Sequence, residues 1–147
     1  MVTETEATNQ KGTRSREMIM ELERERDDWA NMERLVRYYG YSAGLLSYGG
    51  KQERCGLCGR YRKKIGEMVS CRECPIVEAT GRTCDYWWRK AGLNEKRILK
   101  DEHSMCDGFM ITKIFITNLI DRLEKLGLEK TREYYREHTE SVTKGKI

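Results

Sequence analysis

The sequence predicts a mainly α-helical fold that carries one small β-hairpin. Two observations predict the helices. Apolar residues recur at alternating steps of three and four over residues 13–40, and residues 109–128 are the most apolar stretch of the chain. A third observation predicts the hairpin, because residues 60–70 read as two short strands around Ile65 and Gly66. We therefore expect three or four helices, with the hairpin inserted after the first long helix.

The first third of the chain divides into three segments. Residues 1–12 are small and polar without periodicity, so we expect them to be disordered. Residues 13–40 are expected to form a long amphipathic helix with an apolar stripe that Glu25 alone interrupts. The stripe consists of Met18, Leu22, Trp29, Met32, Val36 and Tyr39. Residues 41–54 read as a glycine-rich linker. The stripe suits packing within the protein, and the alternative is an intermolecular coiled coil that makes a homodimer through this helix.

Residues 55–84 hold five of the six cysteines and are expected to form a zinc-binding module. The proposed ligands are two Cys-x-x-Cys pairs, Cys55 with Cys58 and Cys71 with Cys74. Two thiolates three positions apart can bind one ion, and a second pair completes a tetrahedron. Pro75 suits the first turn of a helix directly after the second pair. Together with the hairpin, this predicts a zinc-stabilised treble-clef-like or zinc-ribbon-like module, packed on a helical bundle.

Other uses of the cysteines remain open. Disulfides are the less favoured reading, because the polar N-terminal sequence does not resemble a secretion signal. An iron–sulfur cluster is the alternative cofactor, because four thiolates can also hold one and Cys84 offers a spare ligand. His103 and Cys106 stand in a His-x-x-Cys spacing and are weaker metal candidates, since a complete second site needs a further ligand.

The positive charge of the chain is concentrated in its middle. The net charge is +4, and residues 51–100 carry 13 basic and 6 acidic residues, an excess of +7. Cations interleaved with tyrosine and tryptophan are typical of nucleic-acid binders. The candidate contacts are Arg60, Arg62, Lys63, Lys64, Arg89 and Lys90. The alternative places Trp87 and Trp88 in the core and leaves the charges solvated. Without a recognition-helix signature, we expect binding that is not sequence-specific.

Residues 85–140 are predicted to be helical, and residues 141–147 to be a loose tail. We expect a helix over 85–100 with a break at Gly92, a connection over 101–108, and another break at Gly127 in the apolar segment. The core stripe of that segment comprises Ile116, Leu119, Leu123 and Leu126. It should pack against the stripe of the first long helix, because both stripes need burial.

Few groups in the chain suit catalysis, so we expect no enzyme. His138 lies in a charged helix, and neither a phosphate-binding glycine loop nor a His-Glu-x-x-His motif is present. Four thiolates would close the coordination shell of zinc, which predicts a structural metal. No apolar run reaches the roughly 20 residues that a membrane span needs. We therefore expect an intracellular protein without membrane contact.

The cysteine-rich segment resembles a module of small, mostly uncharacterised proteins of bacteriophages and other prokaryotic viruses. The shared pattern is C-x-L-C-x-x-Y, C-x-x-C-P-[IV] and T-G-x-x-C, carried here by Cys55, Leu57, Cys58, Tyr61, Cys71, Cys74, Pro75, Ile76, Thr80, Gly81 and Cys84. The resemblance implies a viral or prophage origin, a cytoplasmic location in an infected prokaryotic host, and metal binding with Cys84 as an alternate ligand. It assigns no activity. We expect the partner to be nucleic acid or, alternatively, a host protein that this chain inhibits or adapts, with zinc in a purely structural role.

Overall fold

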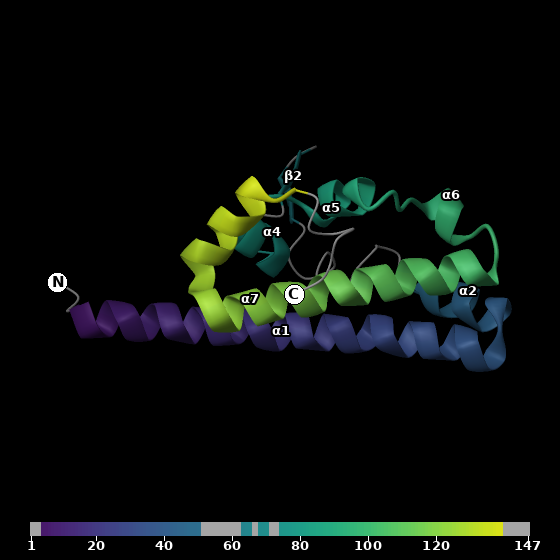
Figure 1. Ribbon diagram of the computed structural model, residues 1–147, viewed down its shortest axis with the longest axis horizontal. Helices are drawn as coiled ribbons and strands as arrows, with labels where there is room; N and C mark the ends of the chain where they lie inside the picture. Colours follow the sequence, from purple (N-terminus) through teal and green to yellow (C-terminus); the bar gives the residue numbers. More distant parts are fainter. Residues whose placement is uncertain (1–3, 51–62, 66–67, 71–73, 140–147) are drawn as a thin grey trace.

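The computed structural model describes residues 4–50, 63–65, 68–70 and 74–139, with side chains described for residues 15–48 and 74–139. The elements are α1 (Glu4–Tyr39), α2 (Tyr41–Gly50), β1 (Lys63–Ile65), β2 (Met68–Ser70), α4 (Pro75–Thr80), α5 (Cys84–Lys90), α6 (Glu95–Ile98) and α7 (Glu102–Glu137). The long helices α1 and α7 run side by side in opposite directions, and α4, α5 and α6 lie on the other side of α7 from α1 in the view of Figure 1.

The core lies between α1 and α7, as the two apolar stripes predict. Met18, Leu22, Met32 and Val36 of α1 are buried in one cluster with Ile116, Leu119 and Leu123 of α7. Trp29 lies at the centre of this contact. Its ring centroid is 5.6 Å from that of Phe109 on α7 and 6.0 Å from that of Trp88 on α5. One aromatic layer therefore connects three helices that are far apart in the sequence.

The fold class needs a correction where it invokes zinc. The β-structure described is a two-stranded antiparallel hairpin in which Lys64 pairs with Val69, at the place where the sequence suggests strands. Among the described residues, however, no group of three or more His, Cys, Asp or Glu side chains could hold a metal ion. The predicted zinc-stabilised, treble-clef-like or zinc-ribbon-like module is therefore wrong as a description of this fold. The fold is mainly helical, and the core that organises it is aromatic and aliphatic.

The helices are longer than the sequence predicts. Helix α1 begins at Glu4, so residues 4–12 are helical where disorder was expected. The expected linker contains the helix α2, and the expected connection over 101–108 is the start of α7. The prediction of a linker is wrong over residues 41–50, because Gly44 permits close packing of helices and does not mark a flexible segment. A Cβ atom at Gly44 would overlap the side chains of Met105 and Val36.

Two residues of the predicted stripes lie outside the core. Tyr39 and Leu126 are exposed, because each is next to a glycine with positive φ at which its helix turns. The turn at Gly127 was predicted from the sequence, and it directs the last part of α7 onto α4 (Figure 1). There, Arg132 Nε donates a 2.8 Å hydrogen bond to the carbonyl oxygen of Glu78. Gly92 likewise separates α5 from α6 as predicted.

A buried carboxylate ties α1 to α7 on one side of the core. Glu33 Oε1 accepts a 2.8 Å hydrogen bond from Lys113 Nζ, and Glu33 Oε2 accepts one of 2.9 Å from Arg37 Nη2. Burial raises the pKa of Glu33, but the hydrogen bonds from Lys113 and Arg37 and their charges outweigh burial and lower the pKa below its ordinary value. The ionised carboxylate therefore stabilises the helix pair.

No helix within the described ranges is both long enough and apolar enough to cross a membrane.

Truncation of the central aromatic layer should strongly destabilise the protein. Phe109 is fully buried and contacts the rings of Trp29 and Tyr48. We expect Phe109→Ala to lower the free energy of unfolding by about 3–5 kcal/mol, measured by urea denaturation. Leu46→Ala removes a side chain that is 80% exposed and serves as the control, with an expected change within about 0.5 kcal/mol. A loss below about 1 kcal/mol for Phe109→Ala would contradict the described core.

The Glu33 cluster should make stability depend on pH in the acid range. A carboxylate whose folded pKa is lowered stabilises the protein above its ordinary pKa of 4.5, and this contribution disappears as the pH falls through the folded pKa. We expect Glu33→Gln to cost about 1–2 kcal/mol at pH 7, since Lys113 and Arg37 are partly exposed. The cost should shrink below pH 4.5. The exposed Glu124→Gln is the control, and equal pH profiles of the two variants would contradict the role of Glu33.

Candidate nucleic-acid interface

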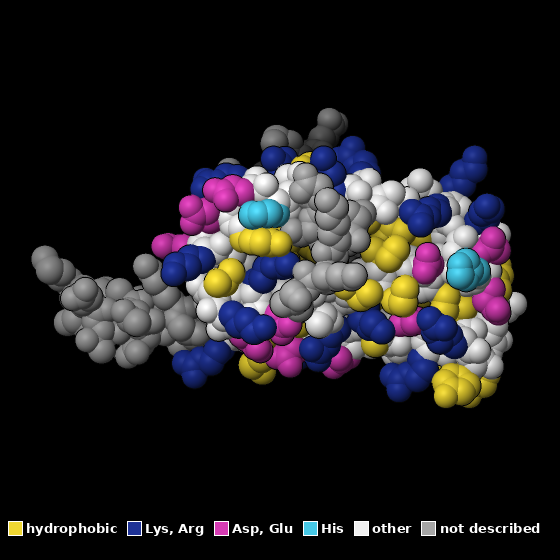
Figure 2. All heavy atoms as spheres, viewed as in Figure 1, with side chains coloured by type: hydrophobic (Ala, Val, Ile, Leu, Met, Phe, Trp, Pro, Cys, Tyr) yellow, Lys and Arg dark blue, Asp and Glu magenta, His cyan; other side chains and the backbone are white. Residues whose placement is uncertain are grey.

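Six exposed cations lie along α4, α5 and α6 and the turns that join them. They are Arg82, Arg89, Lys90, Lys96, Arg97 and Lys100. Residues 74–100 contain three acidic residues, so this stretch has an excess of three positive charges. Dark blue side chains gather over α5 and α6 at the upper edge of Figure 2. We call these six residues the cationic edge.

Short capped helices fix the positions of these cations. Thr83 Oγ1 accepts a 3.4 Å hydrogen bond from the backbone N of Tyr86 and begins α5, which carries Arg89 and Lys90 in its last turn. Asn94 begins α6 in the same way, with a 2.8 Å bond from the backbone N of Arg97. The turn between these helices gains a further link, because Arg97 Nη1 donates a 2.8 Å bond to the carbonyl oxygen of Gly92. The backbone of the edge is therefore held in place, and its six cationic residues remain exposed.

The charges of the cationic edge are not neutralised within the part of the chain that the structure describes. No carboxylate there forms a salt bridge with any of the six side chains. Arg82 lies over the ring of Tyr86 with its guanidinium carbon 4.3 Å from the ring centroid, and Lys90 Nζ lies 5.7 Å from the same centroid. A cation over an aromatic face keeps its charge. The edge therefore presents a field that attracts anions.

The tryptophans cannot act as stacking platforms for bases. Trp87 is 1% exposed and Trp88 is 6% exposed. The indole Nε1 of Trp87 donates a 2.8 Å hydrogen bond to Thr80 Oγ1, and that of Trp88 donates a 3.0 Å bond to Thr112 Oγ1. Both rings are thus buried, and their indole N–H groups have hydrogen-bond partners inside the protein. The alternative reading of the sequence is confirmed for these two residues, and the half-buried Tyr86 lies beneath two cations.

The structure describes one of the four predicted zinc ligands. Cys74 is buried and has an extended backbone directly before α4, and Pro75 occupies the first position of that helix as predicted. The ligands Cys55, Cys58 and Cys71 lie outside the described residues, as do Arg60 and Arg62. Cys84, the alternate ligand, begins α5 and packs against the hydrophobic core. Lys63 and Lys64 lie in β1, where the backbone alone is described.

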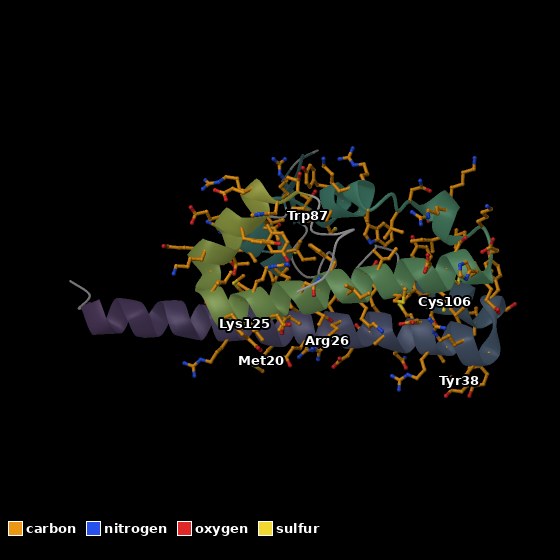
Figure 3. All side chains as sticks on the ribbon, viewed as in Figure 1. Met20, Arg26, Tyr38, Trp87, Cys106 and Lys125 are labelled. Atoms are coloured by element: carbon orange, nitrogen blue, oxygen red, sulfur yellow. The ribbon has the colours of Figure 1, made fainter. Side chains whose placement is uncertain are left out.

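The weaker metal candidates do not form a second site in the described structure. His103 and Cys106 lie in the first turns of α7, with His103 exposed. The Sγ atom of Cys106 is 4.0 Å from the carbonyl oxygen of Glu33, and burial raises the pKa of its thiol despite the opposing charge of Arg37. Figure 3 shows Cys106 near the end of α7 that lies beside α2, away from Trp87 on α5. The ring of His138 stacks on Tyr134, with 4.3 Å between centroids.

The structure enlarges the set of cations that sequence reasoning selected. Arg89 and Lys90 were predicted, and both lie on the cationic edge. Arg82, Lys96, Arg97 and Lys100 join them there. Their signal in the sequence was the general charge excess of the middle segment. The turn at Gly92, which the sequence predicts, brings α5 and α6 to the same edge.

In comparisons with known proteins, no family model, curated protein or solved structure matches this chain. Function must therefore be argued from the geometry above.

The burial of all three tryptophans can be tested by fluorescence. Because Trp29, Trp87 and Trp88 are buried, we expect a blue-shifted emission maximum and weak quenching by acrylamide. Saturating single-stranded DNA should change the emission little, whereas stacking of bases on an indole would quench it strongly. Free N-acetyltryptophanamide serves as the exposed reference. Strong quenching by DNA would contradict the assignment of these rings to the core.

Proposed function

We propose that this protein is a non-enzymatic nucleic-acid-binding protein that contacts the phosphate backbone through its cationic edge. One observation carries the proposal: six exposed Lys and Arg side chains share one edge without a carboxylate partner in the described residues. Phosphate contacts from such side chains supply affinity and release counterions. A small anion would bind a row of cations less tightly than a polyanion, because it contacts fewer of them.

The same geometry argues against reading of the base sequence. Helix α5 has seven residues and α6 has four, and both lie against the body of the protein, so neither offers a long free helix for the major groove. The buried tryptophans remove the stacking contacts that single-strand binders use. We therefore propose recognition of charge and backbone shape, with little preference for sequence.

A zinc ion held by Cys55, Cys58, Cys71 and Cys74 is part of this proposal, with Cys84 as an alternate ligand and an iron–sulfur cluster as the alternative cofactor. The four-thiolate donor set suits zinc. Cys74 precedes α4, so a metal bound there would tether the preceding segment, with its five further cations from Arg60 to Arg72, beside the cationic edge. The resemblance of the module supports a viral protein that acts inside an infected prokaryotic cell.

Binding should respond to salt in proportion to the number of phosphates contacted. If the protein neutralises about four or five phosphates, log affinity should fall against log salt with a slope of roughly −4 on duplex DNA. The double variant Arg89→Glu with Lys90→Glu should weaken binding equally on unrelated sequences and flatten the slope by about 2. Fluorescence anisotropy at several salt concentrations measures both effects.

The control is Lys125→Glu with Lys130→Glu, which makes the same change of net charge at exposed positions of α7 outside the cationic edge. It should leave the slope nearly unchanged. Equal losses in the two double variants would point to net charge and not to the edge. No binding to DNA or RNA at low salt would reject the proposal and favour the alternative, an interaction with a host protein that depends on apolar contacts and responds weakly to salt.

The metal is tested separately. We expect one zinc per chain by elemental analysis of protein purified without chelator, and Cys71→Ser should lower the zinc content, because it removes one of the four proposed thiolate ligands. Cys106→Ser changes a cysteine outside the proposed site and should retain the zinc. A brown protein that contains iron would favour the cluster, and a protein without metal would reject both.

A further inference from the structure

The imidazole ring of His138 is the last member of a stack of three planar groups at the end of α7. Its centroid lies 4.3 Å from that of Tyr134, and the two ring planes are 13° apart. The guanidinium carbon of Arg122 lies 4.2 Å from the same Tyr134 centroid. An aromatic ring has two faces, and two groups this close to its centre cannot share one of them. Tyr134 is therefore covered by Arg122 on one face and by His138 on the other.

Hydrogen bonds hold both ends of this stack in place. Arg122 is buried, and its Nη1 and Nη2 atoms donate bonds of 2.7 and 3.1 Å to the hydroxyl groups of Tyr135 and Tyr134. At the other end, Nδ1 of His138 lies 3.0 Å from the carbonyl oxygen of Tyr134. Because a carbonyl oxygen only accepts, Nδ1 carries the hydrogen of this bond. The imidazole plane is thus fixed in advance, which lowers the entropic cost of stacking another ring on it.

The outer side of the stack is open to solvent. His138 is exposed, although Tyr134 covers one face of its ring. Figure 2 shows both histidine side chains of the chain, in cyan, at the surface. Among the side chains that the structure describes, no ring other than that of Tyr134 stacks on His138. A further aromatic ring can therefore extend the stack by one layer.

The stack lies close to the cationic edge, because the turn at Gly127 directs the last part of α7 onto α4 (Figure 1). A chain of neighbouring rings connects the two places, formed by His138, Tyr134, Tyr135, Trp87 and Tyr86. Successive centroids are 4.3, 5.3, 5.4 and 5.1 Å apart, so the first and last lie at most about 20 Å from each other. Two cations of the edge lie over the last ring. A single strand of about ten nucleotides can thus reach both places.

We propose that His138 is a stacking platform for one unpaired nucleobase of a strand whose phosphates contact the cationic edge. The proposal rests on the nucleic-acid-binding function proposed above and adds a contact to it. A duplex cannot make this contact along its length, because its bases are stacked on one another. Stacking on an aromatic ring tolerates every base, since every base has a π-face. The platform therefore gives a preference for single-stranded segments without a preference for sequence.

The charges around the stack indicate how this contact differs from those of the edge. Residues 128–139 carry three basic and three acidic side chains, so this part of the chain has no excess charge. Stacking, and not attraction of phosphate, must then supply the binding energy here. A contact that neutralises no phosphate releases no counterion. It should therefore change the affinity for a single strand and leave the salt slope unchanged.

Two strands of equal charge test the platform, one with bases and one without. We use oligothymidylate of about 12 nucleotides and an abasic strand of the same length, and measure binding by fluorescence anisotropy. We expect the full chain to bind oligothymidylate at least about fivefold more tightly than the abasic strand. His138→Ala should abolish this preference while its salt slope and duplex affinity stay unchanged. His138→Phe keeps an aromatic ring at this position and should retain the preference.

The matched control is His103→Ala, which removes the other exposed histidine, in the first turn of α7. It should bind both strands as the unmodified chain does. Equal affinity of the unmodified chain for the two strands, or equal losses in His103→Ala and His138→Ala, would overturn the platform. In that case salt-dependent binding of duplex DNA in the same assay would still support the proposed function. Absence of binding to all three ligands would reject that function and the platform with it.

Discussion

The packing of Trp29 between α7 and α5 is the contact on which the other parts of the structure depend. Trp29 contacts Phe109 and Trp88, and through them it joins the long helix pair to the short helices that carry the cationic edge. A core of this kind uses large rings in an interlocked arrangement, where each ring fixes the position of the next. The packing of these buried rings thus fixes where the short helices place their surface charges.

This arrangement assigns separate roles to the aromatic and the basic residues of the middle segment. Trp87 and Trp88 bury their rings and donate their indole hydrogens to Thr80 and Thr112. The neighbouring Arg89 and Lys90 remain exposed at the end of the same short helix. Adjacent residues on α5 therefore anchor the helix and present its charge. Such a surface favours a polyanion recognised by its backbone.

The sequence predicts the helix pair well because its signal is periodic. The sequence predicts that the apolar stripe residues from Met18 to Val36 and from Ile116 to Leu123 face a common interior. These stripe residues are buried in one core. The sequence could not reveal α2, since glycines that permit close packing resemble glycines of a linker. Composition alone could not decide whether Trp88 stacks on bases or on the core, because the answer depends on Thr112, 24 positions away. Cysteine spacing suggested a metal-centred fold, whereas the described core is formed by apolar side chains of α1, α7 and the shorter helices.

The most direct test of the account is a map of the residues that contact nucleic acid. Backbone amide shifts of the full chain, followed by NMR during titration with duplex DNA of random sequence, locate the binding surface. The account predicts that the largest changes cluster at residues 82–100 and diminish with added salt, while α1 residues 16–38 stay nearly unchanged. Changes centred on α1 residues 16–38, or no changes at low salt, would contradict the assignment of the cationic edge as the functional surface.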